Sequence, residues 1–283
     1  MRAQELKKLA DQLPGQDRLM PVLFIGHGSP MNAIEDNIFT DTWHQLGQEI
    51  PKPQAILVVS AHWLTRGTHV TAMTAPPTIH DFGGFPQELF EVSYPAPGDP
   101  ALAREIQQKL HPLTVGLDHE WGLDHSTWSI TRQMFPNADI PVLQLSIDYH
   151  RDAQHHYELG QALSELRKKG VLIIGSGNLV HNLRMIDFRK AMEKGPDGQQ
   201  VEFGYDWAIE INETFKRHIH SGNHQALVDF QKLGKEANLA IPTPDHYFPL
   251  LYTLGLVGKQ DDIQIFNDAY VGGSISMTSV RIG

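Results

Sequence analysis

The amino-acid sequence predicts an α/β fold, in which a single domain contains a central, mostly parallel β-sheet flanked by helices. Apolar, β-rich runs alternate with amphipathic helical stretches along the chain, which is the pattern of such folds. Several runs are apolar without interruption, as is typical of strands that helices cover on both faces. No internal repeat or low-complexity linker divides the 283 residues. We therefore expect one domain over residues 20–283, preceded by an N-terminal helical extension at 1–19.

The same pattern places the individual elements. Short apolar, β-rich runs predict strands at 21–26, 55–61, 69–73, 141–147, 171–177, 263–266 and 274–280. Longer amphipathic stretches predict helices near 36–49, 99–110, 126–135, 152–169, 204–220 and 243–257. Asp99-Pro100 and Thr243-Pro244 each combine an N-cap residue with a proline at the first helical position, so we expect helices to begin there.

Residues 76–98 fit neither a helix nor a strand. The segment contains five prolines, three glycines and four aromatic residues, which is too apolar for a solvent-exposed tail. A loop of this length inside a compact domain is usually functional. We expect it to be a lid or a binding loop.

Charge and composition exclude several classes of function. The formal net charge of −10 repels nucleic acid and anionic membrane surfaces, so neither is an expected partner. The absence of cysteine excludes thiolate ligands and leaves imidazole, carboxylate or water for any metal ion. The first residues lack the apolar core of a signal peptide, and no apolar run is long enough to span a membrane. The cytoplasm is the expected compartment, and no heptad repeat or apolar stripe predicts an oligomer.

Histidines follow three of the predicted strands. His27 and His62 come directly after strands, and His181 lies four residues beyond another. The carboxyl ends of parallel strands meet at one edge of a sheet, where ligands of open α/β sheets bind. His246 is expected in the first turn of a helix capped by Thr243. Any one of these histidines alone would fit a hydrogen-bonded turn residue, but together they predict a metal site.

His125 is a further candidate. It lies between two tryptophans and just before a predicted helix, which suits an acid–base group lining a pocket. A capping-region histidine bonded to Asp124 fits the spacing equally well. The remaining histidines singled out are expected to face solvent: His155, His156, His218 and His220.

Six motifs occur in order along the chain. They are GHGSP at 26–30, SAHW at 60–63, TIHDFGGFP at 78–86, LDHSTW at 123–128, GSGNLVHN at 175–182 and TPDHYFPLL at 243–251. Together they resemble the class III extradiol ring-cleavage dioxygenases, and within them the 4,5-DOPA extradiol dioxygenase branch. The resemblance covers about residues 20–283.

The resemblance implies a metal site with named ligands. His27, His62 and His246 are implied as ligands, with His181 either a fourth ligand or an acid–base residue, and His125 a catalytic histidine in the pocket. The wider class uses two histidines and one carboxylate, so His246 departs from that pattern. The active ion implied is iron(II). An all-imidazole site also suits zinc(II), which we expect a purified sample to be able to carry.

The implied reaction is the opening of a catechol ring by dioxygen, with L-DOPA as the expected substrate, cleaved at the 4,5 position to a seco-DOPA semialdehyde. A small catechol and dioxygen are the expected partners. Phe82 and Phe85 of the long loop, together with Tyr247, are the expected substrate contacts. Two alternatives use the same residues or fold: a zinc-dependent hydrolase and a non-catalytic interaction protein.

Overall fold

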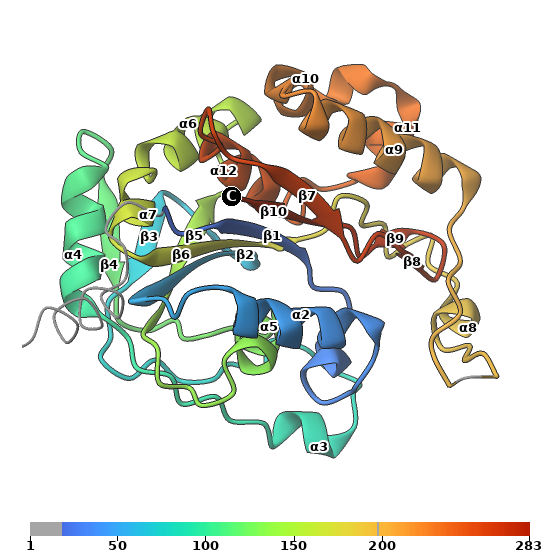
Figure 1. The fold of residues 1–283 in the computed structure, drawn as a ribbon, viewed down its shortest axis with the longest axis horizontal. Helices are drawn as coiled ribbons and strands as arrows, with labels where there is room; N and C mark the ends of the chain where they lie inside the picture. The colour runs from blue at the N-terminus through green and yellow to red at the C-terminus, as the bar shows by residue number, and fades with distance from the viewer. Residues whose placement is uncertain (1–18, 197) are drawn as a thin grey trace, which may run out of the picture.

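The computed structural model describes residues 19–196 and 198–283, so the extension expected at 1–19 lies outside the described residues except for Leu19. An eight-stranded sheet forms the centre, in the order β4-β3-β5-β2-β6-β1-β10-β7 (Figure 1). Its strands are β1 (Val22–Gly26), β2 (Ala55–Thr65), β3 (Thr68–Thr71), β4 (Val115–Asp118), β5 (Val142–Asp148), β6 (Val171–Gly177), β7 (Ile263–Phe266) and β10 (Ser279–Ile282). The short strands β8 (Tyr270–Val271) and β9 (Ile275–Ser276) form a separate pair.

The middle of the sheet is parallel. β6 pairs in parallel with both β1 and β2, and β2 pairs in parallel with β5. Strands of the opposite direction lie towards the sides, where β10 runs antiparallel to β1 and β3 runs antiparallel to β5. The predicted α/β fold with a mostly parallel sheet is confirmed. The carboxyl ends of β1, β2 and β6 consequently lie at one edge.

Helices cover both faces of this sheet. In Figure 1, α2 and α5 lie below it, whereas α6 and α12 lie above. The helices are α2 (Ile38–Glu49), α3 (Gln87–Phe90), α4 (Pro100–Lys109), α5 (His125–Met134), α6 (Ala153–Ala162), α7 (Glu165–Lys168), α8 (Phe188–Ala191), α9 (Asp206–His220), α10 (His224–Val228), α11 (Lys235–Ala240) and α12 (Phe248–Gly255). Two 3-10 turns, η1 (Pro30–Ala33) and η2 (Phe230–Leu233), complete the set within the described part of the chain.

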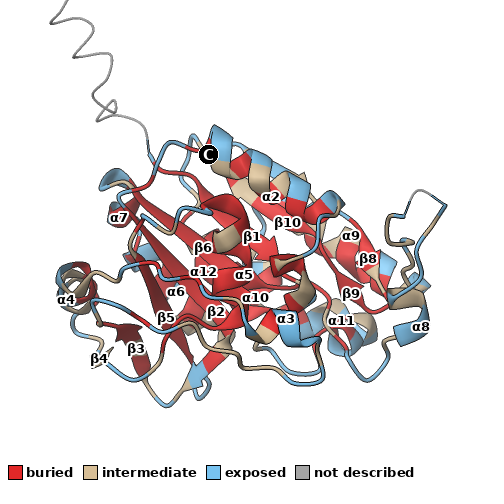
Figure 2. Ribbon diagram, turned by 90° about the horizontal axis from the view of Figure 1, so that it is seen from below, coloured by how far each residue is buried: buried red, intermediate tan, exposed pale blue. Residues whose placement is uncertain are grey.

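Alternate residues of each central strand enter two separate cores. In β1, Val22 and Phe24 pack into the core shared with α6 and α12, whereas Leu23 and Ile25 pack into the core shared with α2 and α5. Because side chains of a strand alternate between faces, an unbroken apolar run is what a sheet covered on both faces requires. Figure 2 shows the consequence: the central strands are buried, and the outer helices carry exposed stripes.

Some predicted boundaries are wrong. The four-residue strand β4 was not expected, since its sequence VGLD contains no apolar run. The strand expected at 274–280 is two short strands, β9 and β10, and the helix expected at 152–169 is divided into α6 and α7. Asp99 does cap α4, accepting hydrogen bonds from the backbone of Ala101 and Leu102. Within the described residues, no helix is long and apolar enough to cross a membrane.

Candidate metal centre

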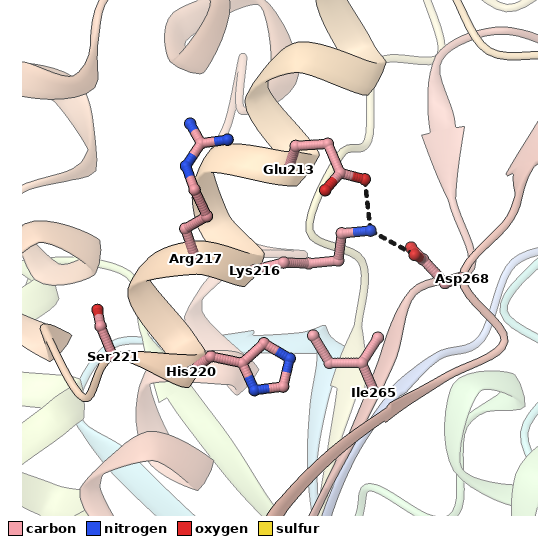
Figure 3. A pocket seen from close by; sticks show the side chains of 7 residues that line it. All are labelled: Glu213, Lys216, Arg217, His220, Ser221, Ile265 and Asp268. Atoms are coloured by element: carbon pink, nitrogen blue, oxygen red, sulfur yellow. Dashed lines mark hydrogen bonds and ion pairs between the residues drawn. The ribbon is translucent and has the colours of Figure 1, made fainter.

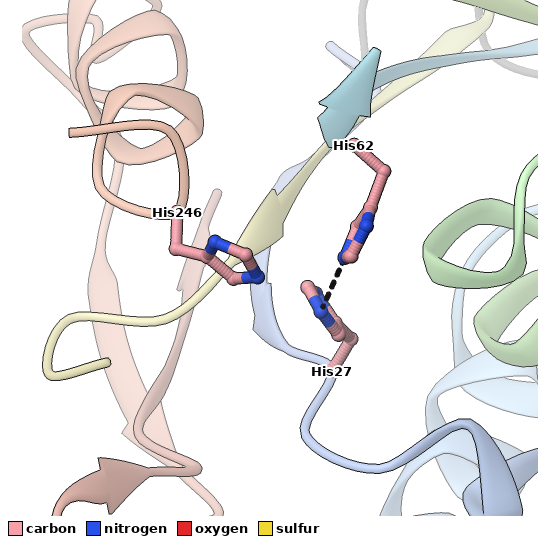
Figure 4. A group of neighbouring side chains, drawn as sticks. All are labelled: His27, His62 and His246. Atoms are coloured by element: carbon pink, nitrogen blue, oxygen red, sulfur yellow. Dashed lines mark hydrogen bonds between the residues drawn. The ribbon is translucent and has the colours of Figure 1, made fainter. Parts of the chain in front are cut away.

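Three imidazoles converge at the edge where the parallel strands end. His27 directly follows β1, His62 lies near the end of β2, and His246 lies in the turn before α12 (Figure 4). One nitrogen from each ring lies within 4.8 Å of the others. The Nε2 atoms of His27 and His62 are 3.4 Å apart. The structure thus brings together three residues that are 35 and 184 positions apart in the sequence.

The backbone explains how two of these rings reach the same point. β2 does not end before His62, as predicted, but continues to Thr65 with a shift of register between Val59 and Leu64. Such an irregularity re-aims side chains, and His62 lies within it. The turn carrying His246 lies directly on Gly177 at the end of β6, where an added Cβ would come within 2.1 Å of the His246 carbonyl oxygen. Glycine is therefore required at 177 for this approach.

The predicted start of the last helix is wrong. α12 begins at Phe248, and Thr243 does not cap it. His246 is instead held by a turn in which the amides of Tyr247 and Phe248 bond to the carbonyl oxygen of Pro244, at 3.0 and 2.8 Å. The amide of Asn178 also donates to the carbonyl oxygen of His246, at 2.9 Å. His246 is thus fixed by the turn and by the end of β6.

Hydrogen bonds outside the cluster determine which nitrogen of each ring faces inward. The Ser176 hydroxyl donates to the Ser126 carbonyl oxygen at 2.8 Å, so it accepts from Nδ1–H of His27, 3.1 Å away. Nδ1 of His246 lies 2.6 Å from a carboxylate oxygen of Asp245, which can only accept. Both rings therefore carry their proton on Nδ1 and direct the lone pair of Nε2 into the cluster, as metal-bound histidines do.

Burial keeps the rings of His27 and His62 neutral. Burial lowers the pKa of His27 well below its ordinary value, and the neighbouring imidazoles of His246, His62 and His125 lower it further. The pKa of His62 is lowered to about 2, again mainly by burial. Neutral imidazoles whose lone pairs converge at this distance repel one another unless a cation lies between them. The donor set therefore fits a metal ion bound by His27, His62 and His246.

His181 lies beside this group and not in it. Its ring stacks in parallel on that of His246, with centroids 3.5 Å apart and planes 5° from parallel. Burial, followed by the charge of His246, lowers its pKa to about 3. The nitrogens of His181 do not belong to either group of metal donors found among the described residues. This position suits a neutral ring close to the metal ligands.

His125 is the first residue of α5, and its partner is Asp81, a residue to which the sequence analysis assigned no role. The backbone amide and Nδ1 of His125 each lie 2.9 Å from Oδ1 of Asp81. Asp124 instead caps the helix by accepting a hydrogen bond from the amide of Thr127, so the alternative interpretation of His125, as a capping-region residue bonded to Asp124, is wrong. Burial alone would raise the pKa of Asp81, but the hydrogen bonds from His125 lower it below its ordinary value. The only sequence signal for Asp81 was its place within the TIHDFGGFP motif.

The long loop is fastened beside this pair. The amide of Ile79 donates to the carbonyl oxygen of Leu123 at 2.7 Å, and the indole of Trp128 donates to the carbonyl oxygen of Ile79 at 2.8 Å. The ring of Phe82 stands edge-on to His125, with centroids 5.6 Å apart, and that of Phe85 contacts Phe82. The loop therefore brings aromatic surface to the histidines. Its roles as a lid and as a substrate contact stay predictions.

Two expectations for individual residues need correction. Tyr247 was expected near the substrate, but only 1% of it is exposed and its hydroxyl donates to the carbonyl oxygen of Leu227 at 2.9 Å. It is a packed structural residue, in contact with the rings of Phe215 and Phe230. His156 was expected to face solvent, yet it is completely buried, with Nδ1 3.0 Å from the Tyr252 hydroxyl.

The burial of His156 predicts acid sensitivity. Burial lowers the pKa of His156 from 6.5 to about 4, and His155 contributes in the same direction. Between these pH values the unfolded chain binds a proton that the folded protein excludes, so the free energy of unfolding falls as the pH falls. The change attributable to this group is on the order of 3 kcal/mol.

Urea unfolding at pH 7 and pH 4 measures this effect. His156→Gln should lose about 3 kcal/mol less than the parent protein between the two pH values. The matched control is His220→Gln, which changes an exposed histidine of α9. An equal loss in His156→Gln and the parent would contradict the assignment.

A separate hollow lies between α9 and the segment around β7 (Figure 3). Its lining consists of Glu213, Lys216, Arg217, His220, Ser221, Ile265 and Asp268. The ammonium group of Lys216 is paired with both Glu213 and Asp268, so its charge is already balanced. The hollow shares no residue with the histidine cluster, and we assign it no part in the chemistry.

The family relationship agrees with this geometry. Residues 21–281 match the family described as the catalytic LigB subunit of aromatic ring-opening dioxygenase. The chain is 49% identical over 269 residues to the 4,5-DOPA dioxygenase extradiol of Escherichia coli (strain K12), covering 93% of this chain and 95% of that protein. It is 36% identical over 273 residues to the Beta vulgaris protein of the same name, covering 94% and 97%. The crystal structure of an uncharacterized protein from Escherichia coli K12 is similar, with a TM-score of 0.79, 43% identity, and coverage of 93% and 100%.

The chain belongs to the LigB family of aromatic ring-opening dioxygenases. Its similarity to proteins named 4,5-DOPA dioxygenase extradiol confirms the predicted branch. The prediction of a ring-opening dioxygenase is likewise confirmed, in preference to a hydrolase or a non-catalytic protein.

Proposed function

We propose that the protein opens the ring of a small catechol with dioxygen, at an iron(II) ion held by His27, His62 and His246. The observation that carries this proposal is the convergence of three imidazoles on one point, two of them buried and the third half-buried. When bound, iron(II) supplies the redox-active ion that the spin-forbidden reaction of a catechol with dioxygen needs, which zinc(II) cannot supply. The all-imidazole donor set nevertheless suits zinc(II), so a purified sample can carry zinc.

His181 is the proposed proton acceptor for the catechol hydroxyl. Its ring is neutral at pH 7, since burial lowers its pKa to about 3, so one ring nitrogen carries a lone pair that can accept a hydrogen bond from the hydroxyl. Stacking on His246 keeps it next to a ligand. His125 is proposed as a second pocket histidine: its Nδ1–H is bonded to Asp81, which leaves Nε2 to accept a hydrogen bond from the substrate or to pass on a proton.

L-DOPA is the proposed substrate, with cleavage at the 4,5 position. The support comes from relatives that carry the name 4,5-DOPA dioxygenase extradiol. Phe82 and Phe85 are proposed to contact the catechol ring, because the loop places Phe82 edge-on to His125. The edge or face of an aromatic side chain, packed against the catechol ring, would hold the substrate in place while the histidines accept protons from its hydroxyl groups.

The test is reconstitution with iron(II) under anaerobic conditions, followed by addition of oxygenated buffer and a panel of catechols. L-DOPA, protocatechuate and caffeate are compared by oxygen uptake and by the yellow colour of the semialdehyde product. Iron-loaded protein should consume one dioxygen per catechol, and zinc-loaded protein should consume none. Absence of uptake with every catechol, by protein verified to contain iron, would sink the proposal. If another catechol is turned over fastest, L-DOPA is rejected as the substrate, but the proposed ring-opening activity still holds.

A further inference from the structure

The Asp81 carboxylate lies between two histidines of the candidate site. Oδ1 accepts hydrogen bonds from both the backbone amide and Nδ1 of His125, each at 2.9 Å. Oδ2 lies 3.4 Å from Nδ1 of His62, one of the three converging rings. The side chain of Asp81 is only 16% exposed. A carboxylate on the solvated surface would have neither these partners nor this burial, so Asp81 is held in a fixed position.

We propose that Asp81 is a positioning residue that fastens the long loop at 76–98 to the metal ligand His62 and to the pocket histidine His125. The proposal rests on the proposed function for the identity of the metal ligands. Oδ1 of Asp81 accepts one hydrogen bond from the backbone amide of His125 and one from its ring, so the helix start and the imidazole are fixed together. The other oxygen of Asp81 lies 3.4 Å from Nδ1 of His62, an ion-pair distance at which the carboxylate favours a proton on that nitrogen and a lone pair on Nε2.

Asp81 also contributes charge that the ligands lack. Three neutral imidazoles leave the charge of a divalent cation uncompensated. Asp245 lies 2.6 Å from Nδ1 of His246, and Asp81 lies 3.4 Å from Nδ1 of His62, so two of the three proposed ligands each have a carboxylate at Nδ1. The third ring, His27, contacts the neutral hydroxyl of Ser176. Carboxylates that bond to metal-bound histidines raise ligand basicity and orient the ring, and their loss typically costs 10–100-fold in metal affinity or activity.

Asp81 also affects the position of the long loop, because its neighbours in that loop are packed against the rest of the protein. Ile79, two residues before Asp81, is bonded through its amide to Leu123, and Phe82, the next residue, stands edge-on to the ring of His125. By contrast, a Cβ added at Gly83 or Gly84, which follow Phe82, would meet no atom within 4 Å, and Gly84 has a φ of 79°. The residues around Asp81 are therefore packed, whereas the two glycines that follow lie in open space. Loss of the carboxylate should disturb both the metal ligand and the surface that meets the catechol.

A second metal ion is the competing interpretation, because His62, Asp81 and His125 also form a group of three potential donors. The hydrogen-bond pattern favours the positioning role. Nδ1 of His125 donates its proton to Asp81, which leaves no lone pair there for a cation, and Nε2 of His62 is already directed at Nε2 of His27. One metal ion per chain is accordingly expected.

The experiment compares Asp81→Asn, which preserves shape but removes the charge, with Asp81→Glu and with Glu88→Gln as the control. Glu88 is an exposed carboxylate of α3, a four-residue helix that the sequence did not predict within the segment 76–98. Metal affinity is measured by competition of zinc(II) with a chelator, and the ligand field by the visible absorption of the cobalt(II)-substituted protein. Asp81→Asn should weaken zinc binding about 10–100-fold and shift the cobalt(II) bands. Glu88→Gln should change neither, and Asp81→Glu should recover part of the affinity.

Steady-state kinetics on iron-loaded protein supply a third measurement, in which Asp81→Asn should raise KM for the catechol as well as lower kcat. Unchanged zinc affinity and an unchanged cobalt(II) spectrum in Asp81→Asn would overturn the proposal, as would two equivalents of tightly bound metal in the parent protein. The zinc and cobalt measurements need no turnover. If the parent protein opens no catechol, the proposed function is overturned. The zinc and cobalt measurements still show whether Asp81 positions a metal ligand.

Discussion

Replacing His27 or His62 by alanine is expected to abolish tight metal binding and, with it, ring opening. Each substitution removes one of three converging donors, and two imidazoles cannot complete the site. His27 is 3% exposed, so its replacement by alanine leaves a buried space where a nitrogen donor had been. The loss of affinity should exceed the 10–100-fold expected for a residue that only supports a ligand.

Metal content after desalting, determined by mass spectrometry, measures this effect, with oxygen uptake as the second readout. His218→Ala, at a half-buried histidine of α9, is the matched control and should retain one equivalent of metal. Thermal unfolding by circular dichroism shows whether a variant has lost its fold as well as its metal. A folded His62→Ala protein that still held one equivalent of metal tightly would remove His62 from the ligand set.

The sheet and its edge were predictable because their signals are local. Unbroken apolar runs identify the central strands, and parallel order follows from the alternation with helices. The rule that sites form at the carboxyl ends of strands then identified His27 and His181. His62 was predicted to follow the end of its strand. In the structure it lies within β2, at a shift of register. That shift depends on pairing with β5, which no local pattern reveals.

The remaining parts of the site depend on contacts between distant segments. Asp81 meets His125 across 44 residues, and neither residue type nor spacing distinguishes it from an ordinary loop carboxylate. Thr243-Pro244 has the composition of a helix start, yet the turn is held against Gly177 and the helix begins later. Tyr247 stands next to a ligand in sequence, but its side chain points into the core. Its position next to His246 in the sequence therefore did not indicate a place in the site, because the turn directs the two side chains apart.

Replacing His181 by alanine is expected to lower kcat by about 10²–10⁴-fold while leaving one equivalent of metal bound. This is the range that a positioned proton-transfer group typically contributes. The physical reason is that His181 stacks on His246 but does not converge with the three donors. Removing it therefore takes away a neutral base and leaves His27, His62 and His246 in place.

The two roles predicted for His181 give different results in one variant. If His181 transfers a proton, iron-loaded His181→Ala binds catechol and turns it over slowly, and its metal content equals that of the parent protein. If His181 is a fourth ligand, the metal is lost or its affinity falls together with activity. Comparison with His125→Ala separates the two pocket histidines, because His125 is bonded to Asp81 and not stacked on a ligand. Loss of metal in His181→Ala with a preserved fold would make it a ligand, and kcat equal to that of the parent would exclude both roles.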